Sequence, residues 1–116
     1  VDMMWYCANY PNVVGQRTME TALKTPNGYG MYDMHGNVME WTHDLYLGNL
    51  GHDAIFDPLV NQQVLDDFGQ NNQGRVVRGG WWLSTPEELR CAVREHRQDT
   101  ADFNNVGFRI GRSFPE

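Results

Sequence analysis

The stretch from Gly30 to Asp44, GMYDMHGNVMEWTHD, constrains the fold most, because it follows no simple hydrophobic period. Its apolar residues neither alternate as in a half-buried strand nor recur at three and four as on one face of a helix. Two glycines and the acids Asp33 and Glu40 interrupt it. The stretch therefore predicts an irregular loop, held by specific polar contacts, that ends in aromatic residues such as Trp41.

The chain of 116 residues predicts one domain. No run approaches the roughly 18 apolar residues of a membrane span, and no signal segment opens the chain. The net charge of -6 argues against a nucleic-acid partner, so we expect neither nucleic acid nor membrane as partners. Lys24 is the single lysine, and arginine without lysine predicts fixed, bidentate pairing inside the fold. The late arginines are Arg75, Arg78, Arg90, Arg94, Arg97, Arg109 and Arg112.

The two cysteines, Cys7 and Cys91, form neither a CxxC pair nor a metal cluster. Two buried thiols are the simpler expectation, and a disulfide between them is the alternative that sequence leaves open. The compartment stays open as well, with cysteine usage favouring the cytoplasm slightly.

Local patterns predict a few short elements. Residues 1–10 suggest a strand or packed arm, residues 18–24 a helical patch, and Pro26-Asn27-Gly28 a turn. Residues 48–74 read as a long surface excursion with a short helix near 61–68. Residues 75–83 predict a strand broken by paired glycines. Thr85 and Pro86 are typical of a helix start. Residues 89–97 continue that helix or return as a strand, and residues 106–110 form a last strand.

Four segments together resemble the formylglycine-generating enzyme, or sulfatase-modifying factor, family. They are residues 27–41 (NGYGMYDMHGNVMEW), 78–82 (RGGWW), 90–94 (RCAVR) and 105–109 (NVGFR). The resemblance implies an α+β fold of the C-type lectin type, with little regular structure and short, twisted antiparallel strands. It covers nearly the whole chain but only the C-terminal part of a typical family domain, so residues 1–116 are expected to lack the family's N-terminal half.

The resemblance also implies a calcium site in the glycine-rich loop. Its ligands are the Asp33 and Glu40 side chains and the main-chain carbonyls of Gly36 and Val38. Calcium takes six to eight oxygen ligands, and loops can supply carbonyls that helices cannot. The alternative is an ion-free turn at Gly36-Asn37, with Asp33 and Glu40 paired to the late arginines.

The family's oxidase chemistry uses copper held by two cysteines, and the resemblance places the first of these positions on Ser84. The second falls within residues 85–89, where no cysteine occurs. Thiolates suit Cu(I) and hydroxyls do not, so we expect no copper and no catalytic residue. A nucleophilic serine needs an adjacent oriented base, which no spacing supplies, so Ser84 is best explained as a turn or cap residue.

The histidines offer one further enzymatic option. Related iron enzymes bind the metal through histidines of a separate domain that has no counterpart here. An iron site of two histidines and a carboxylate needs these side chains to meet in space. The spacing of His35, His43, His52 and His96 in the sequence does not predict such a meeting. His43 beside Asp44 is best explained as a solvated loop pair.

The alternative to an enzyme is a binding module, since lectin-like domains of this family also serve as display scaffolds. The interval between the RGGWW and GFR segments then carries the ligand site: Trp81, Trp82, Ser84 and His96. Aromatic anchors dominate such interfaces, and we expect one tryptophan buried and one exposed.

We therefore expect a formylglycine-generating-enzyme-like domain without the copper cysteines, acting as a non-catalytic module stabilised by calcium. Its ligand would be a carbohydrate, a peptide or a protein. A homodimer, or a partner supplying the missing half, would cover the apolar surface that a half-domain exposes. The alternative is part of a sulfatase-modifying or non-haem iron oxidase whose catalytic residues lie elsewhere.

Overall fold

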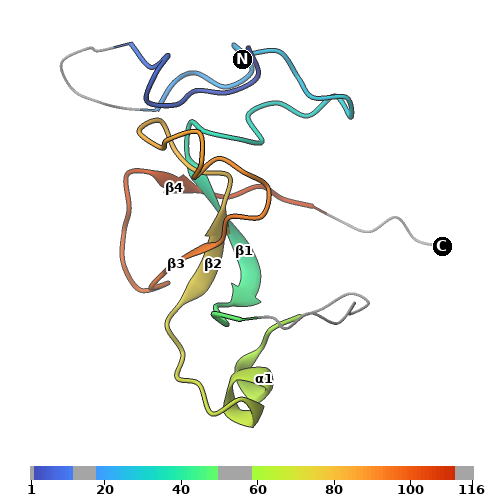
Figure 1. Cartoon of the computed structure of the whole chain (residues 1–116), viewed down its shortest axis with the longest axis vertical. Coiled ribbons are helices and arrows are strands. Elements are labelled where there is room, and N and C mark those ends of the chain that lie inside the picture. The colour runs from blue at the N-terminus through green and yellow to red at the C-terminus, as the bar shows by residue number, and fades with distance from the viewer. Residues whose placement is uncertain (1, 12–17, 50–58, 112–116) are drawn as a thin grey trace.

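The computed structural model describes residues 2–11, 18–49 and 59–111. Five short elements follow one another: β1 (Met39–Leu45), α1 (Gln62–Asp67), β2 (Arg75–Arg78), β3 (Glu95–Arg97) and β4 (Val106–Gly107). The strands form one curled sheet in the order β3-β2-β1-β4. α1 lies beyond one end of the sheet, and the N-terminal arm lies across the other (Figure 1). No helix among these residues is long and apolar enough to cross a membrane.

The sheet is mixed, which corrects the expectation of antiparallel strands. β1 pairs antiparallel with β2, and β2 pairs antiparallel with β3, but β4 runs parallel to β1. Parallel neighbours need a crossover connection, and the chain from β3 supplies one before it enters β4 beside Met39. In this connection the ring of Phe103 contacts that of Trp41, with centroids 6.4 Å apart.

The central strand β1 lies where the sequence predicted an irregular loop. Only its end residues, Met39 and Leu45, are buried, and most of the residues between them are half-buried on both faces. A shift in register with β2 between Trp41 and Leu45 breaks the alternation further. The loop expectation for residues 30–44 holds for residues 30–38 and is wrong for residues 39–44, which belong to β1.

Several local expectations are confirmed. α1 begins after Asn61, whose side chain accepts a hydrogen bond from the Val64 N–H at 3.1 Å, and it ends before Phe68. The turn at Asn27 forms, with the Asn27 side chain accepting from the N–H groups of Tyr29 and Met31. Of the excursion at 48–74, residues 50–58 lie outside the described part of the chain.

Two expected helices are absent among the described residues. Residues 18–24 form an irregular segment with a turn at Thr21 and Ala22, because Ala22 has a φ of 61° and its N–H donates to the Asp33 carboxylate. Thr85 and Glu88 do cap a turn: the Thr85 N–H donates to Glu88 Oε2 at 2.8 Å, and the Glu88 N–H donates to the Thr85 carbonyl at 3.1 Å. That cap opens one turn only, and the chain returns as the strand β3.

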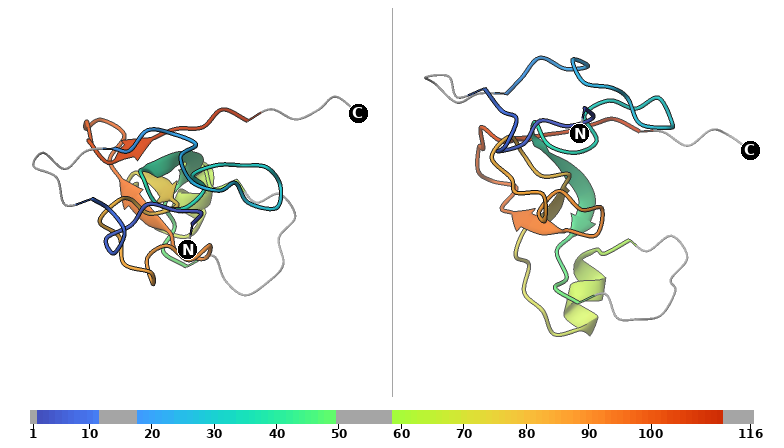
Figure 2. Two further views of the ribbon diagram at one scale, coloured as in Figure 1. Left: turned by 90° about the horizontal axis from the view of Figure 1, so that it is seen from above. Right: turned by 45° about the horizontal axis from the view of Figure 1, so that its top comes forward.

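The N-terminal arm is packed against the loop and not paired as a strand of the sheet. Trp5 makes one parallel bridge with Gly36, and the Trp5 carbonyl accepts from the Asn37 N–H at 3.0 Å. Figure 2 (left) shows the arm and the following segment lying over the end of the sheet. The arm leaves no room for a side chain at Gly36: a Cβ there would lie 1.9 Å from the Trp5 carbonyl oxygen.

The Gly36→Ala substitution should therefore destabilise the fold, because Gly36 also has a φ of +76°. Strain of this kind costs about 1–3 kcal/mol, and the clash with Trp5 adds to it. Gly28→Ala is the matched control, since a Cβ at Gly28 meets nothing within 4 Å. Urea unfolding should show a lower midpoint for Gly36→Ala alone. Equal midpoints for the two variants would contradict this packing of the arm.

Candidate functional site

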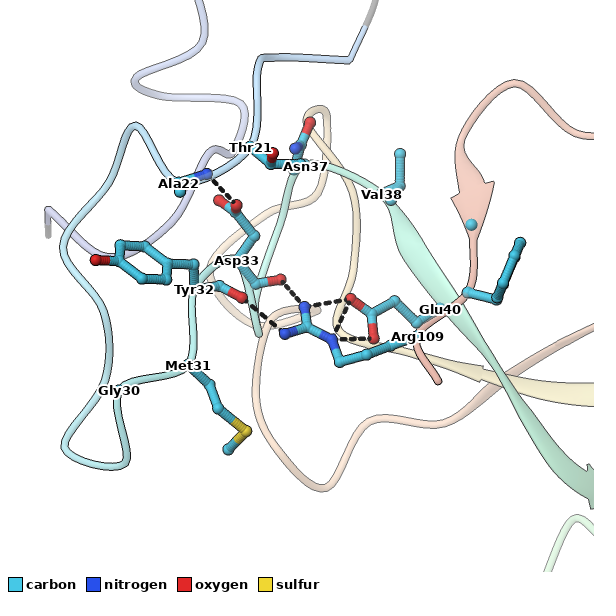
Figure 3. Close-up of a pocket in the computed structure, with 12 residues that line it drawn as sticks. Thr21, Ala22, Gly30, Met31, Tyr32, Asp33, Asn37, Val38, Glu40 and Arg109 are labelled. Atoms are coloured by element: carbon cyan, nitrogen blue, oxygen red, sulfur yellow. Dashed lines mark hydrogen bonds and ion pairs between the residues drawn. The ribbon is translucent and has the colours of Figure 1, made fainter. Parts of the chain in front are cut away.

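The guanidinium of Arg109 joins three segments at the rim of the glycine-rich loop (Figure 3). It binds both carboxylate oxygens of Glu40 on β1, with Nη2 2.6 Å from Oε1 and Nε 3.0 Å from Oε2. The same group donates to the carbonyls of Tyr32 and Asp33, at 3.0 and 3.4 Å. One cation thus holds the loop, the central strand and the segment after β4 together.

The Arg109–Glu40 pair is partly exposed, with 39% and 23% of the two side chains accessible. Its hydrogen bonds to Glu40 raise the pKa of Arg109 above its ordinary value, and burial opposes this rise. A raised arginine pKa means that Arg109 keeps its positive charge at neutral and moderately alkaline pH, and that it loses this charge only in strong alkali. Arg109 therefore remains a cation beside Glu40 at neutral pH.

The Asp33 carboxylate points away from this pair. Its Oδ2 accepts from the Ala22 N–H at 2.8 Å, while its Oδ1 is buried and has no hydrogen-bond partner. Asp33 also has a φ of 53°, a conformation that non-glycine residues rarely adopt. The two acids of the expected calcium site are thus held by different groups: Asp33 by the Ala22 N–H and Glu40 by Arg109. The ion-free alternative expected both acids to pair with late arginines, and only Glu40 does so.

A pocket of about 590 Å³ lies between the loop and β4. It brings together three of the four expected calcium ligands, namely Asp33, Val38 and Glu40, whereas Gly36 lies against Trp5 instead. No cluster of three or more histidine, cysteine or acidic side chains suited to a metal occurs among the described residues. Whether calcium binds here stays a prediction.

The rim of this pocket is apolar and exposed, which sequence reasoning missed. Met31 and Tyr32 are 40% and 41% exposed, and Phe108 is 76% exposed. All three line the pocket with Arg109. Phe108 was expected within a strand over residues 106–110, whereas β4 covers only Val106 and Gly107 and leaves Phe108 exposed.

The expected ligand residues fall into two places. Trp81, Trp82 and Ser84 share one turn, in which the Ser84 hydroxyl accepts from the Trp81 N–H at 3.1 Å. Ser84 is completely buried, as a turn residue, and Trp82 is 2% exposed. Trp81 is half-buried and meets the Trp82 ring edge-on, so one tryptophan is inside and the other is partly accessible.

His96, on β3, belongs to a separate cluster of side chains. Its ring lies 4.4 Å from that of Tyr46, over which the Arg94 guanidinium also stacks at 5.4 Å. His43 and Asp44 lie on β1 and not in a loop, so the expectation of a solvated loop pair holds only in that His43 is exposed. The Asp44 carboxylate accepts from the Val60 N–H at 3.0 Å. His52 lies outside the described residues.

The expectation of two buried thiols is wrong. Cys7 and Cys91 are both exposed and unpaired. Both lie in turns rather than in the core, and the Cys91 Sγ faces His35 Nε2 at 3.7 Å.

The sequence profile of the sulfatase-modifying factor enzyme 1-like domain matches residues 4–114. The chain belongs to this family. That assignment confirms the resemblance on which the C-type lectin-like fold was expected.

Relatives of the chain include kinases, active enzymes and an inactive one. It is 41% identical to the serine/threonine-protein kinase pkn1 of Chlamydia pneumoniae over 76% of its own length and 13% of the kinase. It is 33% identical to the mouse formylglycine-generating enzyme (72% of the chain, 21% of the enzyme) and 31% identical to the mouse inactive C-alpha-formylglycine-generating enzyme 2 (79% and 25%). The chain therefore spans a quarter or less of these curated relatives.

A solved structure shares the fold across most of the chain. The Treponema denticola variable protein 1 superposes with a TM-score of 0.72 and 28% sequence identity. The match covers 92% of this chain and 34% of the variable protein.

Removing one charge from the Arg109–Glu40 pair should lower stability measurably. Glu40→Gln loses a charge-assisted bidentate contact, and we expect a loss of about 1 kcal/mol in the free energy of unfolding. Asp99→Asn is the control, because Asp99 makes a single 3.3 Å contact with Arg75 at a more exposed place. Chemical unfolding at low and high salt measures both. Equal effects of the two variants would contradict a bracing role for the pair.

Proposed function

We propose that this domain is a non-catalytic recognition module for a peptide or protein. The observation that carries the proposal is the state of Ser84, which stands where the resemblance places the first copper thiolate. Ser84 is fully buried, and its hydroxyl accepts from the Trp81 N–H. A hydroxyl is a poor ligand for Cu(I), and one without solvent access cannot reach a substrate. The presence of an inactive enzyme among the relatives supports the same conclusion.

The rim of the large pocket is the best candidate for the recognition surface. Trp82 and Ser84 are buried and offer no contact area, whereas Met31, Tyr32 and Phe108 expose theirs. Large apolar and aromatic side chains around a concavity are what protein interfaces use as anchors. Arg109 is held by Glu40 beneath them, so its charge is already satisfied and the rim offers mainly apolar contact.

Panning of a random phage-displayed peptide library on the immobilised chain tests this surface. We expect enriched peptides whose affinity falls about tenfold or more in Phe108→Ser, because loss of one anchor removes over 1 kcal/mol. Phe68→Ser is the matched control: Phe68 is also exposed, at 64%, but follows α1 at the opposite end of the molecule (Figure 1).

Peptides that bind both variants equally, or no enrichment at all, would refute the proposed surface. Sedimentation of the unliganded chain adds a second readout. A homodimer that becomes monomeric in Phe108→Ser would identify the protein partner as a second copy. A monomer in both would leave a different protein or peptide as the occupant.

We also propose that the glycine-rich loop takes up calcium when the ion is present. The buried and unpartnered Oδ1 of Asp33 supports a cation ligand at this place. Glu40 would supply the second carboxylate, which requires Arg109 to release it. Bound calcium would supply charge and rigidity to the loop rather than chemistry.

Thermal unfolding with chelator and then with calcium tests this proposal. A ligand that binds only the folded state raises the melting temperature, and we expect such a rise in the wild-type chain. Asp33→Ala and Glu40→Ala should abolish it, whereas Asp99→Asn should keep it. An unchanged melting temperature in the wild type would leave Arg109 as the loop's own cation. Stoichiometric copper or iron by elemental analysis would instead revive the enzymatic alternative.

A further inference from the structure

A second, smaller pocket of about 230 Å³ lies on the other side of the glycine-rich loop. Its chemistry-bearing side chains come from distant parts of the chain: His35 from the loop, Arg78 from the end of β2, and Arg90 and Cys91 from the turn before β3. None of these four lines the large pocket. The surface proposed for peptide recognition makes no use of them.

The backbone around Gly79 is what brings these residues together. The Gly36 N–H donates to the Gly79 carbonyl at 2.7 Å, and a Cβ on Gly79 would lie 3.1 Å from the Met34 carbonyl oxygen. This close approach sets the loop directly beside the end of β2. It places the His35 ring 3.7 Å, from Nε2 to Sγ, from a cysteine that lies 56 residues further along the chain.

The pocket is cationic. Arg78 donates through Nη2 to the Cys91 carbonyl, and Arg90 donates through Nε to the Glu87 carbonyl. Both guanidiniums are thus placed by neutral carbonyl groups, and no aspartate or glutamate is among the described residues that line the pocket. Two positive charges beside an exposed thiol favour the approach of an anionic reactant.

We propose that Cys91 is a modification site, at which the thiol forms a mixed disulfide with a small anionic disulfide compound. The Cys91 thiol loses its proton to water, and the thiolate attacks one sulfur of the small disulfide. The bond between the two sulfurs of that compound breaks as the new bond to Cys91 Sγ forms. The other half leaves as a thiolate and takes up a proton. Arg78 and Arg90 attract the carboxylates of the reactant, and His35 holds the thiol at the pocket.

Cys7 is the internal control that the chain itself provides. It is exposed like Cys91, but it does not line this pocket. An effect of exposure alone would make both thiols react alike. An effect of the pocket would distinguish them, and it would do so most strongly for a negatively charged reactant.

The experiment compares two single-thiol chains, Cys7→Ser and Cys91→Ser, with two disulfides. Oxidised glutathione is anionic, and oxidised 2-mercaptoethanol is neutral. Intact mass spectrometry gives the rate of mixed-disulfide formation at constant pH. We expect the ratio of the anionic to the neutral rate to be about tenfold higher at Cys91 than at Cys7, and to fall in high salt.

Variants in the Cys7→Ser background assign the effect. Arg90→Gln should lower the rate with oxidised glutathione severalfold and leave the neutral rate unchanged, whereas Arg90→Lys should keep both. His35→Gln should slow both reactions. Thermal melts confirm that each variant is folded. The proposal is overturned if the rate ratio is the same at both cysteines, or if Arg90→Gln leaves it unchanged. Loss of peptide binding in Phe108→Ser bears on neither outcome, so this site stands independently of the proposed function.

Discussion

The hydrogen bonds of Gly36 and Asn37 hold the N-terminal arm, the segment at Met19 and the turn from Gly79 to Trp82 against the glycine-rich loop. Asn37 is 4% exposed and makes four such bonds. Its N–H donates to the Trp5 carbonyl, and its carbonyl accepts from the Trp82 N–H. Its side-chain amide accepts from the Met19 N–H and donates to the Met19 carbonyl. With so little regular structure, these bonds connect segments that no shared strand or helix connects. A buried amide left without partners would cost about 1–3 kcal/mol for each lost bond, so the arrangement is strongly specified.

The same loop separates the two pockets. Asp33 lines the large pocket and His35 the small one, although they are only two residues apart. Positive φ values at Asp33, Gly36 and Asn37 turn the chain so that neighbouring side chains face opposite sides. Charge is handled differently on each side. Arg109 is neutralised by Glu40 in the large pocket, while Arg78 and Arg90 meet carbonyls in the small one.

Local chemistry explains which elements were predictable. The helix α1 was expected near its observed place, because the Asn61 cap acts within one turn of chain. The turn at Asn27 depends on its own side chain in the same way. The central strand β1 was missed, since its half-buried faces and its irregular register erase the two-residue period. The parallel pairing of β4 was missed because it depends on a crossover and not on the composition of the strand.

The sequence by itself determined the family and the absence of thiols at the expected copper positions, because both are matters of residue identity and order. It also supplied the arginines, of which Arg75, Arg97 and Arg109 form ion pairs with partly exposed side chains. Only the tertiary structure decided which groups meet. Arg109 reaches Glu40 across 69 residues, and Cys91 reaches His35 across 56. Contacts at such separations follow from how the loop docks on Gly79 and from the pairing of β4 with β1, and no local pattern records either.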